Sequence, residues 1–276
     1  MIIIKRPGAG NDHDVTLGPE SVTWRLGWYT RFELVVLGRA VLMQVAHPVI
    51  AAAVRDSYQA DPFARLTRTI TSSQLRLFGG ELAEREAERL LRAHARIPGA
   101  DEELFRWVHA TSFDSLLTAY RLLRPRMPAI HEERLYREWR HTGEVLGIRT
   151  MPGDLTELRE YLDEVVATQL KPTDGVDDLL EAFELRTGKA PGSEHLPSAL
   201  WPLVRPVAAR VLPDFAVGTL PEALRDKLGL EWTDRDERRL RRWIRVIRLV
   251  SAFVPASLLH YPMPYRAMLS ARSSRA

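Results

Sequence analysis

The sequence predicts an all-α protein. From Trp24 onward, segments rich in Leu, Ala, Arg and Glu repeat their apolar residues at the spacing of an amphipathic helix. No stretch alternates apolar and polar residues in the way that a half-buried strand requires. Proline, glycine and acidic residues stand where one helical pattern stops and the next begins. These observations, with a length of 276 residues, predict an N-terminal arm over 1–22 and a single helical domain over 23–276.

The helix boundaries follow from residues that begin or end helices. Pro48 kinks or breaks the first long helix, and Asp61-Pro62 suits the cap and first position of another. Gly79-Gly80 separates two helices, and Asp101-Glu102-Glu103 places acids at the positive end of the next. Residues 171–202 hold four prolines and are the least regular part. We expect helices over 32–54, 62–78, 81–97, 101–124, 130–146, 155–170, 176–187, 197–211, 219–228 and 234–252, with a short one after Pro264.

The absence of cysteine restricts the possible chemistry. Without cysteine there is no disulfide, thiolate nucleophile, iron–sulfur cluster, thiolate-bound heme or covalently attached heme. Any metal must therefore bind to histidine, carboxylate or another oxygen ligand. A chain without disulfides also fits a reducing compartment, and we expect a cytoplasmic protein.

Charge and hydropathy argue against two classes of partner. The net charge is +3, and the densest charged block, 235–245, mixes both signs at the spacing of a solvated helix face, so no nucleic-acid partner is expected. The longest apolar stretch, 32–54, contains charged residues and a proline, which makes it a core helix rather than a membrane span. Residues 1–4 are too short for a signal sequence. Peripheral contact with a membrane remains open.

Histidines are the main candidates for chemistry, because the sequence contains no nucleophile elbow, phosphate-binding loop or zincin motif, and it lacks the pair of Glu-x-x-His motifs that a di-iron bundle requires. Among eight histidines, His94 shares an apolar helical stripe with Leu91, and His109 shares one with Phe113. His47 lies in the most hydrophobic helix. A histidine on a buried stripe is most often a hydrogen-bonded core residue. The alternative is a metal ligand, since neutral imidazole is the commonest one.

A second candidate feature lies on the helix expected over 62–78. Arg65, Arg68, Thr69 and Ser72 follow one another at i, i+3, i+4 and i+7 and therefore share one face. The simpler interpretation is the polar face of an amphipathic helix. The other is a pocket wall, in which guanidinium groups bind carboxylates and a hydroxyl orients a bound molecule.

Several stretches resemble one family in the same order along the chain. Leu17-Gly18-Pro19-Glu20-Ser21-Val22-Thr23-Trp24 begins the series, and Trp107-Val108-His109-Ala110-Thr111 lies near its middle. Together they resemble the MpaB/latex-clearing-protein oxygenase superfamily. The other matching stretches are 38–48, 61–69, 114–115, 119–120, 136–138, 146–148 and 262–266.

This resemblance implies an all-α, globin-like core that holds a non-covalent heme b through one histidine. Latex-clearing proteins use it to cleave a polyisoprene double bond with dioxygen. Their Arg-x-x-Lys-Thr motif resembles Arg65-Leu66-Thr67-Arg68-Thr69, with Arg68 in place of lysine. Because arginine stays protonated, charge stabilisation by Arg65 and Thr69 is expected rather than proton transfer at Arg68.

The resemblance makes His94 the expected ligand of the heme iron, since it follows the arginine–threonine motif at about the family interval. His109 is the second candidate, and His47 is expected to pack in the core or to support the iron ligand from one layer further out. The implied function is a heme-b oxygenase that acts with dioxygen on a small apolar, alkene-containing substrate. A non-enzymatic heme sensor or carrier and a cofactor-free helical binding protein stay open as alternatives.

Overall fold

The chain folds into helices joined by short turns, and no strand occurs among the residues that the structure describes. The computed structural model describes residues 17–26, 30–60, 62–80, 82–95, 101–124, 127–185 and 199–274, with only the backbone for 56–60 and 62–66. The all-α class predicted from the sequence is confirmed. An isolated bridge between Thr30 and His260 is the one β-type contact in the described part.

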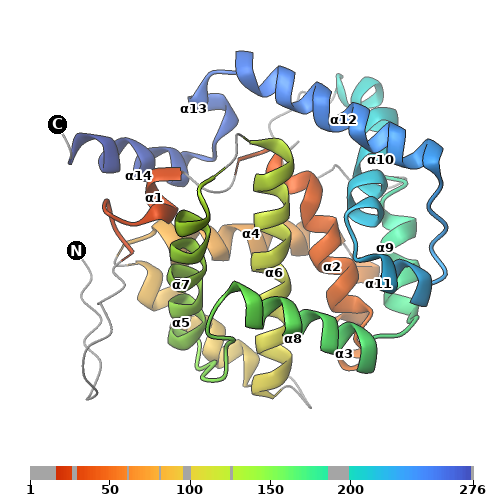
Figure 1. Ribbon diagram of the computed structural model, residues 1–276, viewed down its shortest axis with the longest axis horizontal. Helices are drawn as coiled ribbons and strands as arrows, with labels where there is room; N and C mark the ends of the chain where they lie inside the picture. The colour runs from red at the N-terminus through yellow and green to blue at the C-terminus, as the bar shows by residue number, and fades with distance from the viewer. Residues whose placement is uncertain are drawn as a thin grey trace.

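The elements follow one another as Figure 1 labels them. They are α1 (Val22–Leu26), the 3-10 helix η1 (Glu33–Val36), α2 (Leu37–Val45), α3 (Pro48–Ala60), α4 (Pro62–Phe78), α5 (Leu82–His94), α6 (Glu102–Leu123), α7 (Ala129–Val145), α8 (Leu155–Thr168), α9 (Asp174–Ala182), α10 (Trp201–Gly218), α11 (Glu222–Lys227), α12 (Asp234–Phe253), α13 (Ala256–Leu259) and α14 (Pro262–Ser273).

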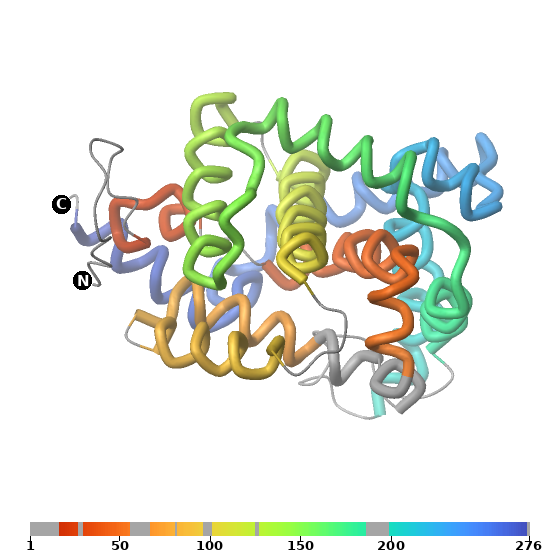
Figure 2. Tube along the Cα trace, turned by 90° about the horizontal axis from the view of Figure 1, so that it is seen from below, coloured from red at the N-terminus to blue at the C-terminus, as the bar shows by residue number. Residues whose placement is uncertain are grey.

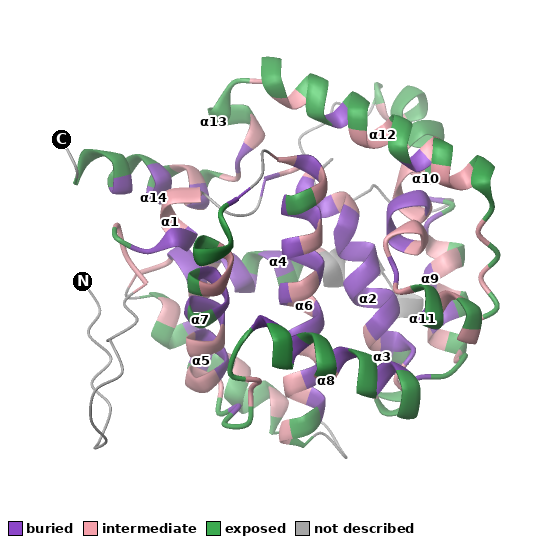
Figure 3. Cartoon of the chain, viewed as in Figure 1, coloured by how far each residue is buried: buried purple, intermediate pink, exposed green. Residues whose placement is uncertain are grey.

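Helix α6 is the central element of the fold. It contacts α2, α7, α8, α12 and η1, and Figure 2 shows it nearly end-on between its neighbours. The Asp101 carboxylate caps its first turn by accepting a hydrogen bond from the Leu104 backbone N–H at 2.9 Å. Trp107, Phe113 and Leu116 are completely buried along it. Their burial explains why so long a helix crosses the core, as the purple faces of α6 and α2 in Figure 3 indicate.

Arg39 ties helix α2 to the centre. Its guanidinium forms an ion pair with Asp114 of α6 and donates to the Ser115 hydroxyl at 3.0 Å. It also donates to the Thr219 carbonyl, at 2.8 Å, just after α10. The preceding Gly38 allows α10 to approach closely, since a Cβ there would lie 2.9 Å from the Ala216 Cβ. One buried arginine thus joins α2 to α6 and to the end of α10.

The helix predicted over 32–54 is divided. After α2 the chain turns at Ala46 and His47, and α3 begins at Pro48, which suits a first helical position. No single described helix is long and apolar enough to cross a membrane. Residues 33–45 and 48–55 would reach that length only together, and they meet at a bend of 108°.

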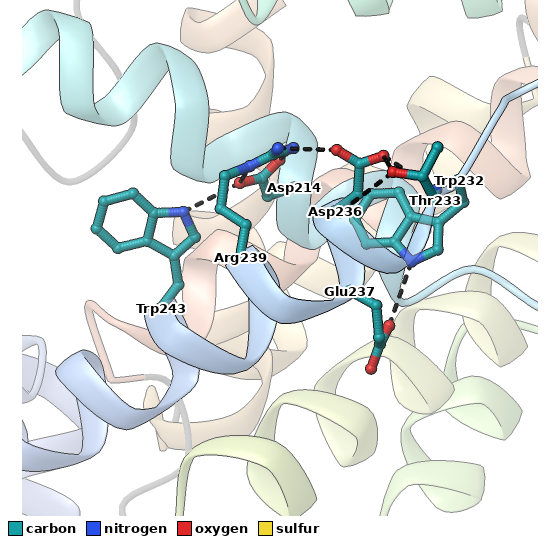
Figure 4. A network of polar contacts seen from close by, with 7 residues as sticks. All are labelled: Asp214, Trp232, Thr233, Asp236, Glu237, Arg239 and Trp243. Atoms are coloured by element: carbon teal, nitrogen blue, oxygen red, sulfur yellow. Dashed lines mark hydrogen bonds and ion pairs between the residues drawn. The ribbon is translucent and has the colours of Figure 1, made fainter.

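A polar network fastens α12 onto α10 (Figure 4). The buried Asp214 carboxylate accepts hydrogen bonds from Arg239 Nε at 2.6 Å and from Trp243 Nε1 at 3.0 Å. Arg239 also reaches Asp236 at 2.8 Å. Thr233 and Asp236 form a capping box at the start of α12. The capping box therefore fixes where α12 begins, and the contacts of Arg239 and Trp243 with Asp214 fix its position on α10.

The N-terminal segment packs against the core where the structure describes it. The buried Glu138 carboxylate accepts hydrogen bonds at 2.8 Å from the backbone N–H groups of Val22 and Thr23 and from the Thr23 hydroxyl. These bonds satisfy free donors at the start of α1. Of the predicted arm over 1–22, residues 1–16 lie outside the described residues.

Candidate functional site

Helices α4 and α5 form a hairpin that carries the arginine–threonine motif and His94. The chain reverses at Gly79 and Gly80, and Gly80 has a φ of +58°, a conformation that favours glycine. The two helices pack against each other, and α4 also contacts α3 and α14. This hairpin therefore places the candidate residues of both helices in one region of the molecule.

His94 is the last residue of α5, and its half-buried ring faces the first turns of α6. The imidazole stacks on the Phe105 ring with 4.5 Å between ring centroids and an angle of 20° between planes. Burial lowers the pKa of His94, and the positive charges of Arg76 and Arg89 lower it further. Neither ring nitrogen is hydrogen-bonded to a described residue. His94 is accordingly a neutral imidazole at pH 7, which is the form that binds a metal.

The arginine–threonine motif lies on α4, and its members differ in exposure. Arg68 and Thr69 are exposed, and Arg65 lies within the helix but outside the described side chains. One turn later the same face is buried at Ser72. The predicted face therefore runs from solvent into the core, with its exposed end at the motif.

A buried polar cluster continues from that face. Ser72, Ser73 and Gln74 of α4 are all buried, and Glu86 of α5 is buried beside them. Arg89 donates to both Glu86 oxygens at 2.6 and 2.7 Å, and this contact lowers the pKa of Glu86. Gln74 Nε2 has no hydrogen-bond partner among the described residues. An unsatisfied buried donor is uncommon and is typical of a position where a bound molecule or water completes the contacts.

Three residues of this cluster, Ser73, Gln74 and Glu86, were not predicted from the sequence to belong to the site. The burial of Gln74 could have been predicted, because Gln74 lies between Ile70 and Leu77 on a helical stripe that is otherwise apolar. The burial of Glu86 had no such signal, since it belongs to a helix start rich in Glu and Arg.

His109, the second candidate ligand, is held by α7. Its Nε2 donates to the Trp139 carbonyl at 3.0 Å, and the two rings stack with centroids 4.8 Å apart. Trp139 Nε1 donates in return to the His109 carbonyl at 3.1 Å. Complete burial lowers the pKa of His109 to about 3. Gly143 leaves room for the ring, because a Cβ there would lie 2.8 Å from Nε2.

His47 lies at the bend between α2 and α3. Its Nε2 is 3.2 Å from the Gln169 amide oxygen, and Gln169 Nε2 donates to Glu103 at 3.1 Å. Because an amide oxygen only accepts, Nε2 carries the proton. Nδ1 is buried without a partner in the described part of the chain. These contacts join the bend to α6 and to the end of α8.

The comparisons with known proteins identify the family. The family model described as ER-bound oxygenase mpaB/B'/rubber oxygenase, catalytic domain, matches residues 24–249. The chain belongs to this family. No curated protein and no solved structure was found to match it.

The match to the mpaB/rubber oxygenase catalytic domain covers η1 and α2 to α11 and most of α12. It includes all five candidate residues, which are Arg65, Arg68, Thr69, His94 and His109. The family is one of oxygenases, so oxygenase chemistry is the reaction class that the comparison supports. Among described residues, no three His, Asp or Glu side chains are arranged to hold a metal ion together.

Proposed function

We propose that this protein is a cytoplasmic heme-b-dependent oxygenase that acts with dioxygen on a small apolar, alkene-containing substrate. The family match supports the oxygenase class. The proposal adds the non-covalent heme, the residues that hold it and the class of substrate.

The environment of His94 carries this proposal. A heme iron needs one or two protein ligands, because the porphyrin supplies four nitrogens, so a group of three protein ligands is not required. His94 offers a neutral imidazole with no protein hydrogen bond among the described residues, held in orientation by Phe105. The charge of Arg76 acts on this imidazole and suits heme propionates nearby. These features fit an iron ligand.

The other residues of the proposed site have supporting roles. When bound, the heme supplies a redox-active iron that binds and activates dioxygen. Arg65 and Arg68 provide positive charge that stabilises anionic groups at the site, and the Thr69 hydroxyl orients a polar group by hydrogen bonding. Arg68 does not remove a proton from the substrate, since its guanidinium stays protonated.

A heme sensor or carrier with two histidine ligands is the alternative. The contact of His109 favours the oxygenase, because its Nε2 donates to the Trp139 carbonyl and offers no lone pair to iron. His47 could act as a second ligand only through Nδ1, since its Nε2 donates to the Gln169 amide oxygen. A heme held by His94 alone would keep a coordination position on its iron for dioxygen.

The test is oxygen-dependent cleavage by the heme-loaded protein. A short cis-1,4-polyisoprene oligomer is the probe, and aldehyde and ketone products are measured with and without dioxygen. We expect turnover that falls at least tenfold in Arg65→Gln, while Arg137→Gln on the exposed surface of α7 serves as the control. Binding of carbon monoxide by the reduced protein without product formation would instead support a carrier, and absence of heme binding would leave the cofactor-free binding protein.

A further inference from the structure

The charge of the chain is unevenly distributed along its length. Residues 238–274 contain eight arginines and no acidic residue, although the whole chain has a net charge of only +3. Six of the eight arginines lie on α12, between Arg238 and Arg248. Residues 238–274 are therefore strongly basic, whereas the rest of the chain has more acidic than basic residues.

The outward face of α12 has two halves of different chemistry. Leu240 and Ile247 are buried and define the inner face. On the outer side, a basic row in the first half consists of Arg238, Arg241, Arg242 and Arg245. An apolar row in the second half consists of Val246, Leu249, Val250 and Phe253, and all eight side chains are exposed. Each row follows the i, i+3, i+4, i+7 spacing. The apolar row begins eight residues after the basic row, which turns it by about 80° about the helix axis, so the two rows adjoin on the outer side of α12.

The apolar row is exposed to an unusual degree. Phe253 is 80% exposed, Leu249 is 62% exposed, and Leu258 of the adjacent α13 is 64% exposed. Figure 1 shows α12 and α13 along one edge of the molecule, and Figure 3 colours the end of α12 and most of α13 as exposed. Contiguous apolar exposure of this kind marks an interaction surface.

Few acidic groups neutralise the basic row. Arg241 pairs with Glu237 at 2.8 Å, and Arg245 Nε donates to the Arg241 carbonyl at 3.3 Å. Within the described residues, Arg238 and Arg242 have no acidic partner. The positive charge is therefore available to an anionic surface.

The helix presents this face rigidly. The Asp214 carboxylate holds Arg239 and Trp243 (Figure 4), and Arg248 Nε donates to the Leu122 carbonyl at 2.6 Å. Because these contacts use the inner side and flank of α12, the outer rows are not needed for folding. Binding would require little ordering of the backbone.

We infer that the outer face of α12, together with Leu258, is a docking surface for anionic lipid membranes. A basic row attracts acidic headgroups, and an adjoining row of Leu, Val and Phe enters the boundary between headgroups and acyl chains. A second copy of the chain fits less well, since pairing the faces places arginines against arginines or against apolar side chains. The inference is independent of the proposed heme chemistry.

Vesicle sedimentation with the full-length protein tests the docking surface. Phosphatidylcholine vesicles with and without phosphatidylserine are compared at low and high salt. We expect association with the phosphatidylserine vesicles that weakens as salt rises. Each arginine near such a surface contributes about fivefold in affinity, so Arg238→Gln/Arg242→Gln/Arg245→Gln should bind about a hundredfold more weakly.

The variant Leu249→Ser/Phe253→Ser should bind at least about tenfold more weakly, because it removes the inserted side chains. Ile130→Ser/Arg137→Gln, which changes an exposed apolar residue and an exposed arginine on α7, is the matched control and should bind as the unchanged protein does. Helical circular dichroism confirms that each variant is folded. Absence of vesicle binding, equal binding by all variants, or preferential binding to an acidic peptide or duplex DNA would overturn the inference.

Discussion

The rings of His94 and Phe105 stack with 4.5 Å between their centroids, which joins the last residue of α5 to the first turns of α6. This contact both orients the imidazole and keeps water from one of its faces. It therefore connects the packing of the helices to the protonation state of the proposed iron ligand.

Replacing Phe105 with Ala should raise the pKa of His94 toward its ordinary value. Burial is the main cause of the lowered pKa, and removing the stacked ring admits water to the imidazole. NMR titration of the imidazole measures this change without any cofactor. Phe253→Ala, an exposed aromatic residue on α12, is the control and should leave the His94 titration unchanged. An unaltered pKa in Phe105→Ala would mean that the stack does not shield His94.

The stability of the protein should fall in mild acid because of His109. Its pKa is about 3 in the folded protein against an ordinary 6.5, so between these values only the unfolded chain binds the proton. The contribution of neutral His109 to the free energy of unfolding is therefore complete above pH 6.5 and decreases as the pH falls below 6.5. The loss is at most about 1.4 kcal/mol per pH unit.

Urea unfolding between pH 7 and pH 5 measures this slope. His109→Gln keeps a donor for the Trp139 carbonyl but does not titrate, so its slope should be shallower. Equal slopes in the two proteins would show that His109 does not contribute to the acid sensitivity.

Gly143→Ala should destabilise the α6–α7 interface by about 1–3 kcal/mol. The added Cβ would lie 2.8 Å from His109 Nε2 and would push the ring from its position against Trp139. Thermal unfolding measures the loss. Gly153→Ala is the comparison, since only the flexible Glu157 carboxylate approaches a Cβ there. A wild-type melting temperature for Gly143→Ala would contradict the tight packing of His109.

Arg39→Met should cost about 3 kcal/mol, because it leaves the Asp114 carboxylate without its buried partner. Adding Asp114→Asn should recover part of that loss, since no unpaired charge then remains. A double-mutant cycle in urea measures the coupling between the two side chains. Strict additivity of the two substitutions would argue that the ion pair does not hold α2 against α6.

The helix boundaries were largely predictable because local residues set them. Pro62 and the Gly79-Gly80 turn limit α4 to the predicted range, and the Asp101 cap begins α6 as expected. Local signals were weaker at α10, which continues to Gly218 through Pro206 and Pro213 although the prediction ended it at 211. The short helices α1 and α13 have too few residues for a periodic pattern, and neither was predicted.

The sequence indicated which residues are candidates for the site, but it did not indicate the contacts that these residues make. The apolar stripe around His94 was visible in the sequence, but its contact with Phe105 depends on how α5 and α6 pack. The engagement of His109 by Trp139, 30 residues away, is likewise a tertiary contact that spacing does not reveal. The burial of Gln74 and the exposure of Arg68 also follow from the neighbours of α4 rather than from its periodicity.

Absorption spectroscopy during a titration with hemin tests the central proposal most directly. The unchanged protein and His109→Gln should both develop a Soret band at equimolar hemin. His94→Ala should lack that band, and added free imidazole should restore it by occupying the vacated ligand position. A Soret band of equal intensity and position in His94→Ala without imidazole would contradict the assignment of His94 as the iron ligand.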